Sequence, residues 1–288
     1  MSWIIVGVGV CFLFYACYIE PRWLRIRHYQ VPIDGLDKPV RALVVADLQP
    51  NIYHWDIDRL RRAFERAFAE RPDVVFWLGD YYNTPMCFQK RLLDRFPRLK
   101  QWVLQRLPVM EEIAYEMGAF KVPMGHVAVL GDHDWFWSGE KTRQHLEEVG
   151  ISVLVDEVMM LVHPETDQPL QVVGYDDISS GRTPDFASVH AAIDPTIPQI
   201  ALSHSPDAFT AARGGPRIML SGHTHGGQVR LPFFGALFLP IRRKTFDRGW
   251  FSDARRRLFV SAGVGTSFPP MRFMVRPEMV ILELVPAF

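Results

Sequence analysis

Hydrophobic runs alternate with amphipathic segments along most of the 288-residue chain. Short apolar runs bounded by polar turns are typical of buried strands, whereas apolar positions three and four residues apart are typical of helices. This alternation predicts an α/β fold. The predicted strands are Val40–Ala46, Asp73–Leu78, Val127–Leu130, Gln171–Tyr175, Gln199–Ser203, Arg217–Ser221, Leu258–Ala262 and Met279–Leu284, and the clearest helices are Asp56–Glu70 and Gly139–Val149.

The N-terminal run from Trp3 to Ile19 contains no charged residue. A transmembrane helix needs roughly 17–25 such residues, so this run lies at the short limit. Positive charge follows the run instead of preceding it, at Arg22, Arg25 and Arg27. This arrangement favours a membrane anchor with a cytoplasmic domain over a cleaved signal peptide. An apolar helix packed against the domain is the alternative.

We therefore expect residues 1–27 to form the anchor and residues 28–288 to form one domain that starts with a linker from His28 to Pro39. A single α/β domain of this length can bury a full core. The 32 basic and 32 acidic side chains balance, so we expect no nucleic-acid partner. Three scattered cysteines are too few for a disulfide framework.

Five of the predicted strands end at, or one residue before, an aspartate or a histidine. In α/β folds the reactive groups gather at the carboxyl ends of the strands. One such aspartate would be an ordinary turn or helix cap, but five together predict a metal site. The residues delivered in this way are Asp47, Asp80, the sequence Asp132-His133-Asp134, His204 and the pair His223 and His225.

Two divalent ions that share a carboxylate can clamp a phosphate and activate a water molecule. Carboxylates and imidazoles are suitable ligands for such a pair. Asp47 and Gln49 are two residues apart, so on an extended strand end their side chains point to the same side, and His223 and His225 have the same spacing.

These segments, ADLQ, LGDYYN, LGDHD, LSHSPD and SGHTHGGQ, occur in the order of the five signature blocks of calcineurin-like metallophosphoesterases and resemble them closely. The tail from Gly263 to Arg272, followed by Arg276-Pro-Glu, resembles a bacterial, membrane-associated branch of that superfamily. The resemblance implies a four-layer α/β/β/α sandwich and phosphoester hydrolysis by a metal-bound hydroxide that attacks phosphorus.

The resemblance also implies roles for individual residues. Asp47 and His225 would hold the first metal ion, Asp80 would bridge both ions, and His204 and His223 would hold the second. His133 would act as the acid for the leaving oxygen and Asp134 would orient it.

Two positions depart from the family pattern. Gln49 stands where the family has a metal-binding histidine, and Asp132 where it has asparagine. Gln49 is expected to bind the first ion more weakly through its carbonyl oxygen, whereas Asp132 should strengthen the second site. Because oxygen ligands favour harder ions, we expect Mn²⁺ first, ahead of Mg²⁺, Fe²⁺ or Zn²⁺. The alternative is that Gln49 faces away from the metals.

Two further segments suggest a membrane partner. Residues 81–123 are expected as an insertion or cap, in which Phe88–Pro108 combines apolar bulk with basic charge as an interfacial helix does. A helix packed on the domain is equally consistent with that segment. A second apolar segment, Leu231–Pro240, precedes Arg242, Arg243 and Lys244.

The expected function is hydrolysis of a phosphate ester or pyrophosphate of a membrane lipid or lipid-linked nucleotide, such as UDP-diacylglucosamine, at the bacterial inner membrane. Two alternatives stay open at this point. One is a phosphodiesterase with soluble substrates, and the other is a non-catalytic membrane protein that binds metal.

Overall fold

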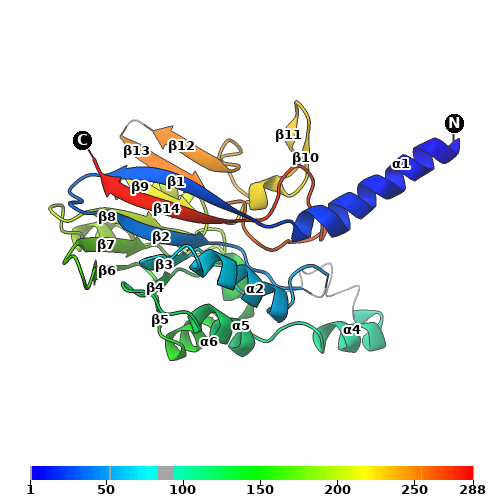
Figure 1. The fold of residues 1–288 in the computed structure, drawn as a ribbon, viewed down its shortest axis with the longest axis horizontal. Helices are drawn as coiled ribbons and strands as arrows, with labels where there is room; N and C mark the ends of the chain where they lie inside the picture. The colour runs from blue at the N-terminus through cyan, green and yellow to red at the C-terminus, as the bar shows by residue number, and fades with distance from the viewer. Residues whose placement is uncertain (1, 52, 84–93, 254, 288) are drawn as a thin grey trace.

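The computed structural model describes residues 2–51, 53–83, 94–253 and 255–287. Two six-stranded sheets form the centre of the domain, and helices cover their outer faces (Figure 1). The first sheet has the strand order β1-β14-β2-β3-β4-β5 and the second has the order β12-β13-β9-β8-β7-β6.

The first sheet is mainly parallel and contains the strands that precede three of the candidate site segments. β2, β3, β4 and β5 pair in parallel, and β14 joins β2 in antiparallel orientation. Their bounds are β1 Arg25–Ile33, β2 Val40–Val45, β3 Val74–Trp77, β4 His126–Ala128, β5 Ile151–Val153 and β14 Glu278–Pro286.

The expected linker from His28 to Pro39 is wrong in its first half. Residues 25–33 form β1, which pairs in parallel with β14 over nine residues. The polar side chains that suggested a linker alternate with buried ones towards the end of this edge strand, where Val31 and Ile33 join the core. An edge strand with one solvent-facing side lacks the continuous apolar run of a central strand.

The second sheet carries the other two site segments. β7, β8, β9 and β13 pair in parallel, and antiparallel strands form both edges. The strands are β6 Glu157–Val162, β7 Pro169–Gly174, β8 Gln199–Leu202, β9 Ile218–Ser221, β12 Gly249–Asp253 and β13 Arg256–Val260. A short hairpin, β10 Arg230–Leu231 and β11 Gly235–Ala236, stands apart from both sheets.

Alternation of side chains along the strands separates three apolar cores, because successive residues of a strand face opposite sides. In β2, Ala42 and Val44 face the second sheet, whereas Leu43 and Val45 face the outer helices. The outer helices are α2 Ile57–Phe68, α5 Met110–Gly118 and α6 Asp132–Glu148 on the first sheet, and α7 Phe186–Ala191 and α8 Ala208–Ala211 on the second. The four layers are therefore helices, sheet, sheet and helices, as expected.

Helix α2 shows how the local sequence determines an element. The carboxylate of Asp56 accepts a hydrogen bond from the backbone N–H of Arg59 (2.8 Å) and caps the helix. Its buried residues follow the spacing of one helical face and pack on the first sheet: Leu60, Ala63, Phe64 and Ala67.

The predicted insertion is only partly described. Its helical segment Phe88–Pro108 falls in part on residues 84–93, which lie outside the described residues, and the described part contains α4 Pro97–Leu104. Phe96 and Trp102 are exposed there. The later part forms α5, which packs on the same apolar core as α2 and is joined to it by an Arg61–Glu116 ion pair of 2.5 Å.

At the N-terminus, α1 Ser2–Phe14 continues through a π-helical turn (Tyr15–Ile19) and a 3-10 turn (Glu20–Arg22). Helix α1 projects away from the domain, at the end opposite the C-terminus (Figure 1). Within the described parts of the chain, no helix combines the length and apolar character needed to cross a membrane.

Candidate metal centre

The predicted site residues meet at the carboxyl ends of strands from both sheets. Asp47, Asp80 and Asp132 follow β2, β3 and β4, whereas His204 and His223 follow β8 and β9. Two groups of these side chains lie close enough to hold an ion. The first cluster is Asp47, Asp80 and His225, the second cluster is Asp80, Asp132, His204 and His223, and within each cluster the ligand atoms lie within 4.8 Å of one another.

The second cluster has spacings that suit a small cation. Oδ1 of Asp132 lies 3.2 Å from Nε2 of His204 and 3.2 Å from Nδ1 of His223, and these two nitrogens are 3.1 Å apart. Ligand atoms that surround an ion at about 2.0–2.1 Å lie roughly 3.0–3.4 Å from one another. The second cluster therefore already has the spacing of a coordination sphere.

Backbone carbonyls orient both imidazoles of the second cluster. Nδ1 of His204 lies 2.7 Å from the carbonyl of Leu78, and Nε2 of His223 lies 3.2 Å from that of Pro240. In metal proteins a ligating histidine almost always donates its second ring N–H in this way, which turns the other nitrogen towards the ion.

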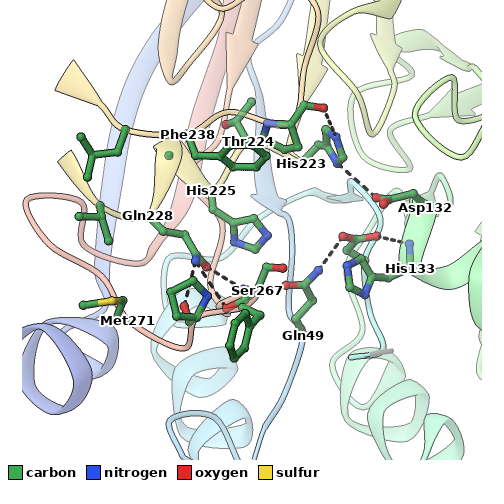
Figure 2. A pocket seen from close by; sticks show the side chains of 17 residues that line it. Gln49, Asp132, His133, His223, Thr224, His225, Gln228, Phe238, Ser267 and Met271 are labelled. Carbon is green, nitrogen blue, oxygen red and sulfur yellow. Dashed lines mark hydrogen bonds and ion pairs between the residues drawn. The ribbon is translucent and has the colours of Figure 1, made fainter. Parts of the chain in front are cut away.

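The first cluster is less complete. Nε2 of His225 is 3.8 Å from Oδ1 of Asp47, and Nε2 of Gln49 donates a hydrogen bond of 2.7 Å to Oδ2 of Asp80. Gln49 thus points into the centre rather than away from it, as Figure 2 shows. It is fully buried.

Buried polar atoms without a hydrogen-bond partner occur in both clusters, and three of them lie at the first. Among the described residues, Oδ2 of Asp47, Oε1 of Gln49 and Nδ1 of His225 have no hydrogen-bond partner. Leaving such an atom unsatisfied typically costs about 1–3 kcal/mol. A cation would satisfy these acceptors, so the residues present fit a divalent ion.

The backbone of the centre is strained at its ligand positions. Asp47, Asp80, His223 and His225 have φ of 52°, 59°, 68° and 49°, and Gln49 has a φ of 30°. Non-glycine residues in this left-handed region are uncommon and cluster at functional sites, because the strain must be compensated by the surrounding structure.

Asp134 connects the loop that carries Asp80 to the start of α6, which carries Asp132. Its fully buried carboxylate accepts hydrogen bonds from the backbone N–H groups of Asp80 (2.8 Å), Tyr81 (3.0 Å) and Gly131 (2.9 Å). A Cβ on Gly131 would meet Oδ1 of Asp80 at 2.3 Å, so no other residue fits there. The expected action of Asp134 on the His133 ring stays a prediction.

Electrostatics differ between the two clusters. Burial alone would lower the pKa of His204, but the charges of Asp80 and Asp132 outweigh it, so the pKa of His204 lies well above its usual value. Burial and the nearby Arg272 guanidinium lower the pKa of His225 well below the usual value. Burial and the charge of Asp80 raise the pKa of Asp47 to about 6 and that of Asp134 to about 7.

Arg272 was not singled out as a site residue by the sequence. Its buried guanidinium donates hydrogen bonds to the carbonyls of Ala262, Gly263, Gly265 and Val275, and this segment lies against Asp47. An arginine in a Pro-Pro-Met-Arg tail gives no local signal of burial, since arginines are mostly exposed.

A cavity of about 520 Å³ lies over the centre. One wall consists of Gln49, Asp80, Asp132, His133, His223 and His225. The other wall is largely apolar, as Figure 2 shows in part, and includes Val229, Leu237, Phe238, Phe268, Pro269 and Met271. The cavity can therefore hold a molecule with one charged and one apolar part.

Comparison with known proteins decides the family. The family model for the calcineurin-like phosphoesterase matches residues 40–227, which is more than half of the chain and contains all of the predicted ligands. The chain belongs to the calcineurin-like phosphoesterase family. It is accordingly a metallophosphoesterase, an enzyme class that hydrolyses phosphoesters with divalent metal ions.

The individual relatives reported next are each less than 30% identical to the chain. The chain is 27% identical over 276 residues to phosphodiesterase YaeI of Escherichia coli, covering 94% of this chain and 92% of the relative. It is 23% identical to the uncharacterized metallophosphoesterase YkuE of Bacillus subtilis, covering 94% and 88%. It is 28% identical over 145 residues to UDP-2,3-diacylglucosamine pyrophosphatase LpxG of Chlamydia muridarum, covering 46% and 44%.

Proposed function

We propose that this metallophosphoesterase hydrolyses a phosphate ester or pyrophosphate bond in a membrane lipid or a lipid-linked nucleotide, such as UDP-diacylglucosamine. The observation that carries the proposal is the cavity with one polar and one apolar wall. Ligand sites use apolar walls for affinity and a few polar groups for orientation. An acyl chain would lie along Leu237, Phe238 and Phe268, with the phosphate next to His133.

We assign the metal ligands as the sequence predicts. Asp80, Asp132, His204 and His223 would hold one ion, and Asp47, Asp80 and His225, with the oxygen of Gln49, would hold the other. When bound, two divalent ions, of which Mn²⁺ is our first choice, neutralise phosphate charge and lower the pKa of water.

His133 would supply the remaining chemistry. Its ring lines the cavity, and its backbone N–H donates a hydrogen bond of 3.0 Å to Oδ1 of Asp80. From this position it would give a proton to the leaving oxygen as the bond to phosphorus breaks. Asp134 fixes the loops on either side, which keeps His133 in place relative to Asp80.

Soluble phosphodiesters are the second candidate, because a relative over nearly the whole chain is named a phosphodiesterase. The match to a lipid pyrophosphatase covers only 46% of this chain. We further propose that the enzyme works at the inner membrane with its domain on the cytoplasmic side, which rests on Arg22, Arg25 and Arg27 following the apolar run.

A substrate panel tests the proposal. Detergent-solubilised protein with Mn²⁺ is assayed with UDP-diacylglucosamine, with the same nucleotide sugar lacking its acyl chains, and with an aryl phosphodiester. We expect the acylated compound to have the highest kcat/KM, and Phe238→Ala to lower its advantage over the deacylated one. Equal kcat/KM values for the acylated and the deacylated compound would support soluble substrates. A lack of hydrolysis of all three compounds with any divalent ion would support a non-catalytic protein.

A further inference from the structure

Apolar side chains are exposed on two elements that project from the same end of the domain, α1 and the β10–β11 hairpin (Figure 1). At the hairpin tip Phe233 is fully exposed and Phe234 is 83% exposed, and Leu237 and Phe238 follow with 60% and 73%. On α1 the exposed residues include Trp3, Ile4, Val6, Val8, Val10, Leu13 and Phe14. Contiguous apolar surfaces of this kind mark interaction sites.

The backbone at the hairpin tip is unfavourable for the residue it carries. Phe233 has a φ of 67°, where glycine or asparagine would be the usual choice. In water this strained turn gains no burial for the ring. Strained and exposed aromatic residues indicate that the tip is used in another environment.

Phe273 connects the two elements. Its ring centre lies 4.7 Å from that of Phe12 on α1 and 6.3 Å from that of Tyr15, the first residue of the π-helical turn that follows α1. Its carbonyl accepts a hydrogen bond of 3.0 Å from the N–H of Arg230, the first residue of the hairpin. The hairpin and α1 are therefore held in a defined relation to each other.

The hairpin also reaches the centre. Leu237, Phe238 and Pro240 line the cavity, and a Cβ at Gly227, two residues after His225, would meet Cβ of Ala236 at 2.4 Å. The apolar surface of the tip thus continues along one chain segment into the apolar wall of the cavity.

Positive charge adjoins this surface. The backbone N–H groups of Arg242 and Arg243 donate hydrogen bonds to the carboxylate of Asp207 (2.8 and 3.2 Å), and their side chains are exposed. Nζ of Lys244 lies 5.9 Å from the ring centre of Phe238. Aromatic and aliphatic bulk next to basic side chains is complementary to an anionic bilayer, with rings among acyl chains and cations at phosphates.

We propose that the β10–β11 hairpin inserts Phe233 and Phe234 into an anionic lipid bilayer beside α1, and that Leu237 and Phe238 then form a continuous apolar path from the acyl-chain region to the cavity. This inference adds a route by which the proposed lipid substrate would reach the cavity. It rests on the proposed function only for the identity of the molecule that uses the path. Insertion itself requires no catalysis.

Bilayer depth can be measured at the tip. Phe233→Trp places an indole there, and vesicles of phosphatidylglycerol and phosphatidylethanolamine with brominated acyl chains quench only rings that reach the chains. The matched control is Val162→Trp, an exposed position on β6, which lies on the side of the domain away from α1 (Figure 1). We expect extra quenching for Phe233→Trp over the native protein and none for Val162→Trp. Equal quenching in both variants would overturn the proposal.

Vesicle partitioning of the full chain provides a second measurement. The double substitution Phe233→Ser and Phe234→Ser should weaken partitioning at least about tenfold, since removing one such ring from an apolar phase is worth about one to two orders of magnitude. Met160→Ser with Val162→Ser removes two exposed apolar side chains from β6 and should leave partitioning unchanged. If the tip substitutions instead dissociate a dimer in light scattering without changing partitioning, the surface joins two copies of the chain and the proposal is wrong. Neither assay contains substrate, so an incorrect assignment of the hydrolytic substrate would not alter the results.

Discussion

The two clusters of the proposed metal centre share Asp80 but differ in what surrounds their remaining side chains. In the second cluster Asp132 is paired with two imidazoles at 3.2 Å, each held by a backbone carbonyl. In the first cluster His225 lies 3.8 Å from Asp47, and several buried polar atoms have no partner within the described structure. The potential ligand atoms of the second cluster are thus held closer together than those of the first.

The difference shows how the same residue types acquire different chemistry. The carboxylates around His204 raise its pKa well above the usual value, so metal binding at the second cluster competes with protonation. Burial and Arg272 keep His225 neutral. The structure around the two clusters also differs. The first cluster packs against the segment around residues 262–275, and in this segment the backbone N–H of Arg272 donates a hydrogen bond to the carbonyl of Ala16 (2.8 Å).

The largest effect is expected from Asp80→Ala, because Asp80 belongs to both clusters. We expect turnover to fall to background and the bound metal to fall from two ions to at most one. Elemental analysis of the purified variant, alongside a phosphodiester assay, measures both. As a control, prolonged treatment of the native protein with a chelator should likewise abolish hydrolysis. Full activity in thoroughly metal-free protein would contradict the two-ion assignment.

The next effect concerns a side chain that belongs to neither cluster. His133→Asn should lower turnover by about 10²–10⁴-fold, the range typical of general acid–base catalysis, and most for substrates with poor leaving groups. Metal content should stay at the native level in elemental analysis. If this variant loses an ion instead, His133 is a ligand and the division into two clusters is incorrect.

The candidate residues that the sequence predicted lie close together in the structure, because the strands that precede them end at the same edge and a strand end is a local signal. The roles assigned to these residues stay predictions. It predicted the edge strand β1 poorly, since a strand with one exposed face resembles a polar linker. It also missed Arg272, whose role depends on carbonyls from a loop that only the folded chain brings around it. The apolar wall of the cavity combines residues 229–240 with residues 267–271, and their proximity is likewise a property of the fold.

The stability of the structure around the first cluster should decrease in acid, because His54 is buried there. Nε2 of His54 lies 2.6 Å from the carbonyl of Cys17, and Nδ1 lies 3.3 Å from Oγ1 of Thr266. Burial, together with the charge of Arg22, lowers the pKa of His54 from 6.5 to about 4. Because the folded-state pKa is lowered, this contribution to stability is present above pH 6.5 and is lost as the pH falls towards 4.

We expect the free energy of unfolding of the metal-free protein to fall by roughly 2–3 kcal/mol through this group as the pH is lowered over that range. Denaturant titrations at several pH values measure the effect, and the comparison with His54→Gln isolates it, because glutamine cannot take up the proton. The same pH dependence in both proteins would show that other groups, such as the buried carboxylates, cause the acid sensitivity.

The smallest effect concerns the two positions that depart from the family pattern. Gln49 offers the first cluster an amide oxygen, and its nitrogen is occupied by Asp80 (2.7 Å), whereas Asp132 adds a carboxylate to the second cluster. We therefore expect two distinguishable Mn²⁺ affinities in a calorimetric titration, with the second cluster filled first.

Gln49→His should bring the two Mn²⁺ affinities together, because an imidazole would replace the weakest ligand of the first cluster. A gain on the order of tenfold is expected there, the lower end of what tuning residues around metal sites contribute, together with a shift in preference towards Zn²⁺. Asp132→Asn should weaken the tighter site instead, since a neutral amide replaces a carboxylate that faces both His204 and His223. Equal affinities in the native protein would contradict the asymmetry between the clusters. No response to Gln49→His would mean that Gln49 acts only by holding Asp80. The asymmetry between the clusters would then come from their protonation and not from their ligands.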